Sequence, residues 1–234
     1  GEIAAMERIL EILVSSFWPL LEAGIKTTVP LTLISFALGM ILAFIVAMMR
    51  LSKITVLSKI AQFYVWVIRG TPLIVQLFVI FYGLPRVGIV FSPFVSAVIG
   101  LVISEGAYDS EIIRAAIQSI PKGQWEASHA LGFKKIQTLT HVIVPQAALI
   151  AVPSLGNMFI SLLKDTSLTA ILTVREIFQI GQQIVAVTFE PLWIYLEVGL
   201  VYLIFSSVLS KLQVMLEKKL GKHMVAMGPA KKEA

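Results

Sequence analysis

The sequence predicts an all-α integral membrane protein with five transmembrane helices. Hydrophobic residues make up 57% of its 234 residues, and the mean hydropathy is +0.88. Charged residues account for 14%, well below the ~25% of an ordinary globular domain. The apolar residues fall into long runs separated by short basic patches, as spans and their loops do. The net charge of +5 is therefore interpreted as a set of orientation signals, and no nucleic-acid partner is expected.

The first span is placed at 28–49, close to the ~20 residues that a membrane helix needs. The apolar run begins earlier but is interrupted by two prolines and two charges, Pro19, Glu22, Lys26 and Pro30. Residues 1–27 are accordingly predicted to be an external or interfacial segment. Arg50, Lys53 and Lys59 follow the span in a short loop. Because basic residues in short loops mark the cytoplasmic side, the amino terminus is expected outside.

The second and third spans are placed at 60–84 and 91–120. Pro72 removes a helical hydrogen bond and Gly70 gives room beside it, so a kink or break is expected inside the second span. A short and nearly uncharged external turn separates the two spans. The third span then returns to the cytoplasmic side, where a polar loop over 121–145 follows.

The remaining chain contains two more spans, at 147–172 and 192–215, with an amphipathic external segment at 174–189 between them. The fourth span is expected to bend at Pro153 and Gly156. Residues 217–234 form a basic tail that fits the cytoplasmic side. The transmembrane domain therefore covers 28–216, with its carboxyl terminus in the cytoplasm.

Polar side chains inside the predicted spans are the first candidates for a site. Glu105 lies about a dozen residues, or ~18 Å, into the third span, where a charge needs a partner or a wet cavity. It either lines a substrate path, with Tyr108 on the same helical face, or pairs structurally with Lys164 or Arg69. Glu111 and Arg114 are three residues apart and are expected to pair.

A second polar cluster, Lys164-Asp165-Thr166-Ser167, lies in the fourth span. Neighbouring opposite charges suit the carboxylate and ammonium of a zwitterion, and the two hydroxyls offer short hydrogen bonds. The alternative is a cap at the external end of the helix that satisfies its own neighbours.

The loop over 121–145 is too polar to cross a bilayer. Its apolar positions share one helical face up to Gly132, which is suited to end a short helix, and a second helix is expected up to Pro145. The spacing Glu126-Ala127-Ser128, Gly132, then Val142-Ile143-Val144-Pro145 resembles the EAA loop of permease subunits of ATP-binding-cassette (ABC) importers. Ser for Ala at 128 and Val for Leu at 144 are conservative departures. An interfacial helix lying on the membrane is the alternative.

Three further segments extend the resemblance to about 27–216: Arg69-Gly70-Thr71-Pro72-Leu73, Gly123-Gln124-Trp125-Glu126-Ala127 and Lys164-Asp165-Thr166-Ser167-Leu168. Together they resemble the polar amino acid permease subfamily, whose members are type I importer domains with five spans. Tyr82-Gly83-Leu84-Pro85 with Gly88-Ile89 is most similar to the L-cystine permeases. Arginine, glutamine and histidine remain alternative substrates.

The resemblance implies a bacterial inner-membrane subunit that works with several partners. They are a second permease copy or a homologous permease, a cytoplasmic ATPase dimer that binds ATP and Mg, and an external substrate-binding protein. It implies ATPase coupling through five residues, Glu126, Ala127, Ser128, Gly132 and Pro145. The candidates for the substrate path are Arg69, Thr71, Glu105, Tyr108, Lys164, Asp165 and Ser167.

Other functional classes are less consistent with the sequence. No Walker-type glycine-rich motif occurs, so the chain is expected to hold no ATP itself. With Cys 0 and its three histidines confined to the loop and the tail, no nucleophile or metal site is expected within the bilayer, so the chain is not predicted to be an enzyme. A stand-alone secondary transporter is disfavoured because internal repeats are not evident.

Overall fold

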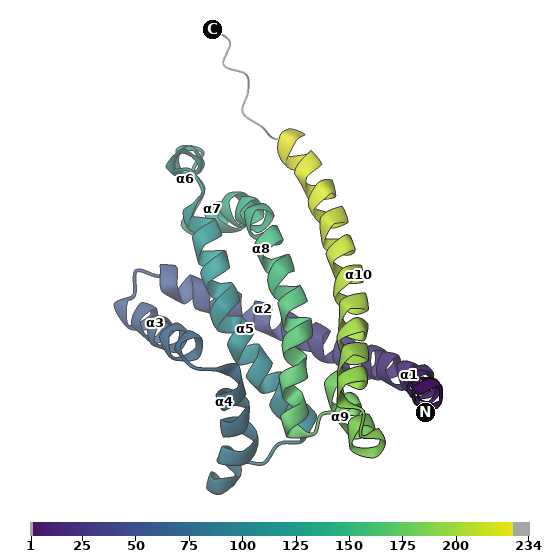
Figure 1. Ribbon diagram of the computed structural model, residues 1–234. Helices are drawn as coiled ribbons and strands as arrows, with labels where there is room; N and C mark the ends of the chain where they lie inside the picture. The colour runs from purple at the N-terminus through teal and green to yellow at the C-terminus, as the bar shows by residue number, and fades with distance from the viewer. Residues whose placement is uncertain (1, 227–234) are drawn as a thin grey trace.

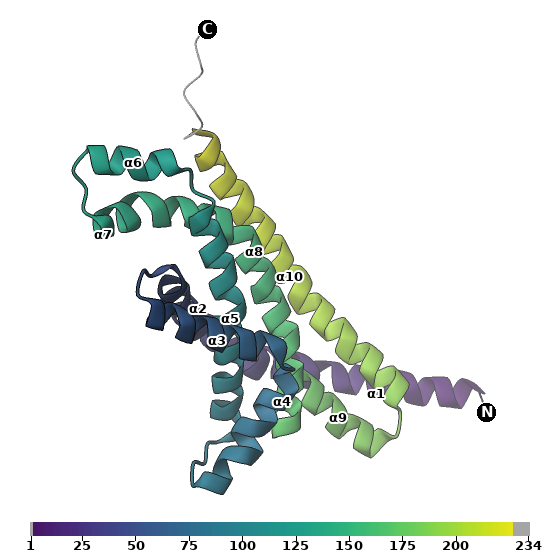
Figure 2. The same ribbon diagram turned by 90° about the vertical axis from the view of Figure 1, so that its left-hand side faces the viewer.

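The computed structural model describes residues 2–226, all of them in helices or short connections, with no strand in that range. Figures 1 and 2 show α5, α8 and α10 running alongside one another, with α6 and α7 at one end and α4 and α9 toward the other. The elements in chain order are α1 (Glu2–Ala23), η1 (Gly24–Thr28), α2 (Val29–Leu51), α3 (Thr55–Gly70), α4 (Leu73–Phe78), η2 (Val79–Gly83), η3 (Leu84–Val87), α5 (Pro93–Gln118), α6 (Lys122–Ala130), α7 (Lys135–Thr138), η4 (Leu139–Ile143), α8 (Val144–Asp165), η5 (Thr166–Leu172), α9 (Ile177–Thr188) and α10 (Pro191–Ala226).

Three helices of the described residues are long and apolar enough to cross a membrane: Ile3–Leu51, Lys135–Leu172 and Pro191–Leu220. A fourth span results if α3 and the helix after it count together. At 26 residues α5 has the length of a span, but its acidic side chains make it less apolar. The count of five spans and the orientation of the termini remain predictions.

The expected interruption of the first apolar run does not occur, because α1, η1 and α2 form one continuous helix. The boundary placed between residues 27 and 28 falls inside it, and the boundary at 216/217 likewise falls inside α10. Pro19 lies inside α1, and a π-helical turn, η1, precedes Pro30, so neither proline breaks the helix. The segment before residue 28 is therefore joined rigidly to the helix that follows.

A π-helical turn precedes three of the prolines by the same spacing. Pro30, Pro85 and Pro145 each stand two residues after the last residue of η1, η2 or η4. A proline donates no hydrogen bond to the carbonyl four residues earlier, and its ring crowds that carbonyl. The wider turn lets the residue before each proline bond the carbonyl five residues back instead, as in Val29 to Gly24, Leu84 to Val79 and Val144 to Leu139.

The break predicted in the second span is confirmed. The helix axis turns by 104° between α3 and the segment Leu73–Val87, at Thr71 and Pro72, which are both extended. The side-chain amide of Gln76 donates to the carbonyls of Ile68 (2.9 Å) and Thr71 (3.2 Å). These bonds satisfy backbone acceptors that the break would otherwise leave free.

The closest helix pairing is that of α2 with α5, made possible by small side chains on α2. Ser35, Gly39, Ala43 and Ala47 recur every four residues and are all buried. Such a stripe lets two backbones approach closely, as at helix contacts in membranes. At Gly39 the approach is so close that an added Cβ would lie 2.8 Å from the Cβ of Glu105.

A second group of helices joins α1, α9 and α10 around an apolar cluster of Leu20, Ile177, Ile194, Val198 and Val201. Two buried carboxylates have partners in it. Glu176 accepts hydrogen bonds from the backbone N–H of Gln179 (2.7 Å), capping α9, and from the hydroxyl of Tyr202. Glu197 accepts one from Ser16. The amino-terminal helix is thus packed onto α9 and α10 rather than lying free on the membrane.

Candidate functional site

The loop that resembles the EAA motif folds as a helical hairpin at the end of the molecule where α10 also ends (Figures 1 and 2). Gly132, at φ +81°, follows the end of α6. Its N–H donates to the carbonyl of His129 (2.9 Å), and the N–H of Phe133 donates to that of Ser128 (3.0 Å). This is a Schellman motif, for which glycine is the favoured residue. The predicted helix end at Gly132 is confirmed.

The second predicted helix of the loop also forms, but it does not stop at Pro145. The helix Lys135–Leu172 includes α7, η4, α8 and η5. The loop and the fourth span are therefore one unbroken helical stretch, which bends where α7 and η4 pass into α8 (Figure 2). The Gln146 amide donates to the side-chain oxygen of Gln124 (3.2 Å) and ties α6 to this stretch.

The five residues predicted to couple to an ATPase divide into exposed and internal positions. Glu126, Ala127, Gly132 and Pro145 are exposed. Ser128 is buried, and its hydroxyl donates to the carbonyl of Gln124 (2.7 Å), so serine replaces alanine without leaving an unpaired polar group.

Two large apolar side chains of the loop face outward, beyond the residues that the motif names. Leu131 is 76% exposed and Ile136 74% exposed. Trp125 instead packs inward against the ends of α5 and η4. The hairpin is thus anchored on one side and presents apolar surface next to Glu126 on the other.

Glu105 occupies the contact between α5 and α2. It is 3% exposed, and one of its carboxylate oxygens has no hydrogen-bond partner in the described structure. Neither Lys164 nor Arg69 forms a salt bridge with it within residues 2–226, so the structural pairing considered from the sequence is absent there. Asp109, one helical turn on, is also buried, with both carboxylate oxygens unpaired in that range.

Arg69 and Tyr108 come together from α3 and α5. The guanidinium carbon lies 5.3 Å from the ring centroid of Tyr108, within the range of a cation–π contact. Both residues line a hollow of about 660 Å³ between α3, α5 and α8, together with Glu111 and Ser154. The combination of aromatic, basic and acidic side chains is chemically suited to a zwitterion.

Glu111 forms a polar cluster beside this hollow that joins α5 to α2. It accepts from Arg114 (2.9 Å), as predicted, and also from Arg50 at the end of α2 (2.7 Å). The contribution of Arg50 was missed because it is 61 residues away in sequence and was interpreted only as a topology signal. Nothing in the sequence pattern could have indicated this pairing.

The cluster at 164–167 lies where α8 passes into η5. Lys164 and Asp165 are exposed and Ser167 is half-buried. The hydroxyl of Thr166 donates to the carbonyl of Leu163 (2.6 Å), which is the self-capping arrangement considered as the alternative. In the described part of the chain, none of the four forms a hydrogen bond or salt bridge with Glu105, Arg69 or Tyr108. Thr71 bonds only near the helix break, to Val67 (2.9 Å) and to Gln76 (2.9 Å).

Comparison with known proteins assigns the family. Residues 26–222 match the family described as the binding-protein-dependent transport system inner membrane component. The chain belongs to this family. It is 47% identical over 215 residues to the L-cystine transport system permease protein TcyB of Bacillus subtilis (strain 168), with 92% of each chain covered.

Two further proteins are similar to this chain along most of its length. The nopaline transport system permease protein NocM of Agrobacterium fabrum is 37% identical over 227 residues, covering 93% of this chain and 94% of its own. A solved structure titled as an amino acid ABC transporter with histidines superposes with a TM-score of 0.82 at 33% identity, covering 88% of this chain and 96% of its own. This member of the family is accordingly a membrane-embedded permease subunit of an amino acid ABC importer.

Proposed function

We propose that the chain is the permease of an L-cystine importer in a bacterial inner membrane. The 47% identity to TcyB across 92% of both chains carries this proposal. In it, a second permease copy or a homologous permease completes the path, and an external binding protein delivers the substrate. A cytoplasmic ATPase dimer, which binds ATP and Mg, supplies the energy.

The hollow beside Arg69 and Tyr108 supports a place for the substrate in this scheme. The guanidinium of Arg69 suits the carboxylate of an amino acid, and the ring of Tyr108 on the same wall suits its ammonium group. We include Thr71, Glu105, Lys164, Asp165 and Ser167 in the proposed path on sequence grounds. For Glu105 the supporting observation is a buried carboxylate oxygen that has no hydrogen-bond partner within residues 2–226. Burying a carboxylate in a membrane costs free energy, and such residues are typically functional.

The hairpin of α6 and α7 supports coupling to the ATPase. Its exposed Leu131 and Ile136 offer apolar contact area on the same hairpin as Glu126, and the unbroken helix from α7 into α8 joins the hairpin to the fourth span. Closure of the ATPase dimer would displace the hairpin and, through this helix, the α8 wall of the hollow. Alternating access in this scheme follows from rigid-body motion rather than from local unfolding.

Uptake measurements test the substrate. Labelled cystine is supplied to vesicles that contain the reconstituted assembly, with and without ATP on the ATPase side and with excess arginine, glutamine or histidine. ATP-dependent cystine uptake that resists all three competitors is the expected result. ATP-dependent uptake of a competitor in place of cystine would support an ATP-driven importer but reject cystine as its substrate. Uptake that needs no ATP would reject the proposal that the assembly is an ATP-driven importer.

Co-purification tests the coupling hairpin. Glu126→Lys reverses one exposed charge and is expected to release the ATPase while the permease stays in the membrane. Lys122→Glu, at the first residue of α6, is the matched control for a charge reversal on the same helix. Retention of the ATPase by the Glu126 variant, or equal loss in both, would count against Glu126 as a docking residue.

A further inference from the structure

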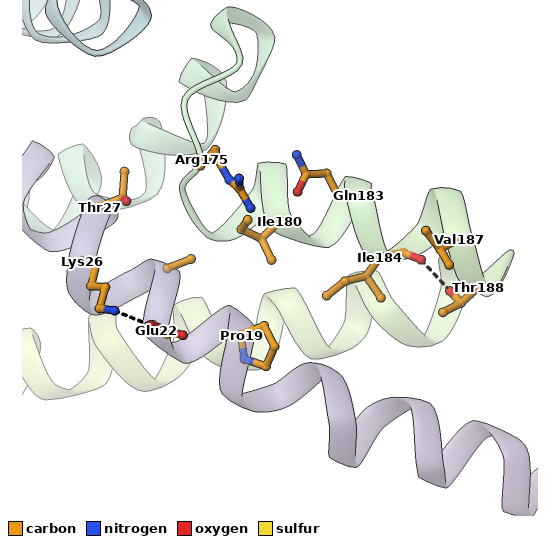
Figure 3. A pocket seen from close by; sticks show the side chains of 11 residues that line it. Pro19, Glu22, Lys26, Thr27, Arg175, Ile180, Gln183, Ile184, Val187 and Thr188 are labelled. Carbon is orange, nitrogen blue, oxygen red and sulfur yellow. Dashed lines mark hydrogen bonds and ion pairs between the residues drawn. The ribbon is translucent and has the colours of Figure 1, made fainter.

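A second hollow lies far from the coupling hairpin, between α9 and the junction of α1 with η1 (Figures 1 and 3). It measures about 660 Å³. Lys26 and Thr27 lie at one end with Arg175 across from them, and Ile184 and Val187 lie toward the other end, beside Thr188. This division of one elongated hollow into a cationic and an apolar half is what an amphiphilic ligand requires.

The cationic end has an excess of positive charge. Lys26 pairs with Glu22, one helical turn before it, and both side chains are well exposed. Arg175 lies on the opposite wall, is exposed, and forms no salt bridge or side-chain hydrogen bond within residues 2–226. Two cations therefore face one carboxylate. The unmatched guanidinium presents a planar set of donors that fits a phosphate group.

The surroundings specify where the phosphate comes from. The chain belongs to a family of inner membrane components, so the phosphate groups present around it in highest concentration are those of lipid headgroups. Ile180, Ile184 and Val187 continue from the cationic end along α9. We propose that this hollow binds an anionic phospholipid, with its phosphate on Arg175 and Lys26 and an acyl chain along these three side chains.

A lipid held there would bridge two parts of the molecule that are otherwise joined by few polar contacts. The backbone N–H of Ile177 donates to the hydroxyl of Thr28 at 3.3 Å, and Arg8 reaches the carbonyl of Thr188 at 3.1 Å. The phosphate would add a bond from η1 to Arg175, two residues before α9. The inference is independent of the substrate of the importer, and its failure would leave the proposed transport function intact.

Lipid titration of the purified full chain tests the cationic end. Phosphatidylglycerol, phosphatidylcholine and inorganic phosphate are added separately in a neutral detergent, and the bound ligand is counted by native mass spectrometry. Arg175→Gln and Lys26→Gln are each expected to weaken phosphatidylglycerol binding about fivefold, the effect of one basic residue near an anionic lipid. Arg175→Lys keeps the charge but loses the planar set of donors, so its phosphatidylglycerol binding should lie between that of the wild type and that of Arg175→Gln. Arg86→Gln, an exposed arginine elsewhere, is the control.

Three outcomes would overturn the proposal. One is unchanged phosphatidylglycerol binding in both neutralised variants, and another is an equal loss in the Arg86 control. The third is equal binding of phosphatidylcholine or inorganic phosphate, which would remove the need for an anionic lipid. Ile184→Asn probes the apolar end: it should weaken phosphatidylglycerol but leave soluble glycerol phosphate unaffected, and equal effects on the two would show that no acyl chain lies there.

Discussion

Gly39→Ala tests the close contact between α2 and α5. The added Cβ would lie 2.8 Å from the Cβ of Glu105, an atom attached directly to the backbone of α5 that no change of rotamer can move aside. The two helices must therefore separate by a few tenths of an ångström or more. Overpacking of this kind costs about 1–3 kcal/mol.

Gly199→Ala is the matched control, because nothing lies within 4 Å of a Cβ at this position in α10. Both glycines are inside helices, so each variant gains about 1 kcal/mol of helix propensity, and this gain cancels in the comparison. Thermal unfolding of both proteins in the same detergent then isolates the overpacking cost. At about 2–4 °C for each kcal/mol, the Gly39 variant should melt about 2–12 °C below the Gly199 variant.

Equal melting temperatures for the two variants would refute this reasoning. They would mean that α5 can move away from α2 without loss, so that the small side chains of α2 do not set the distance between the helices. A second readout is substrate uptake, because the same displacement moves Glu105. Loss of uptake together with the lower melting temperature is the expected pattern.

Three other predictions concern single side chains. Glu111→Gln weakens the acceptor of two arginines and should lower the free energy of unfolding by about 1–3 kcal/mol, whereas Glu190→Gln, at an exposed pair of 3.6 Å, should cost less than about 1 kcal/mol; equal shifts in thermal melts would contradict this. Gly132→Ala forces a side chain into a left-handed conformation, which costs about 1–2 kcal/mol. It should therefore weaken co-purification of the ATPase more than Gly132→Asn or the unstrained Gly123→Ala does. Equal retention of the ATPase by all three variants would reject the role of the turn. Glu105→Gln should alter uptake affinity or selectivity without loss of assembly, and unchanged kinetics would assign Glu105 to packing alone.

Several features of the site follow from local sequence. Gly132 ends α6 because a left-handed residue is needed there, and the pairing of Glu111 with Arg114 follows from helical spacing. The break at Pro72 follows from a missing hydrogen-bond donor. Each of these depends on residues within one or two helical turns of one another.

The rest depends on contacts between distant segments, which composition and periodicity do not encode. Pro30 is expected to break a helix, but the helix continues past it by means of a π-helical turn. Packing of α1 on α9 and α10 favours this one continuous helix. Arg50 reaches Glu111 only because α2 and α5 cross closely. The cationic and apolar halves of the hollow at Arg175 meet only because α9 folds back beside η1.

The sequence by itself therefore determined that the chain is a helical membrane protein and which loop resembles a coupling motif. Hydropathy and turn chemistry are local, so they can be interpreted before any fold is known. Only the tertiary structure decided which polar side chains meet. It left Glu105 unpaired against Gly39 and brought Arg69 onto Tyr108, because the partners of a buried group are set by how helices cross, not by their order in the chain.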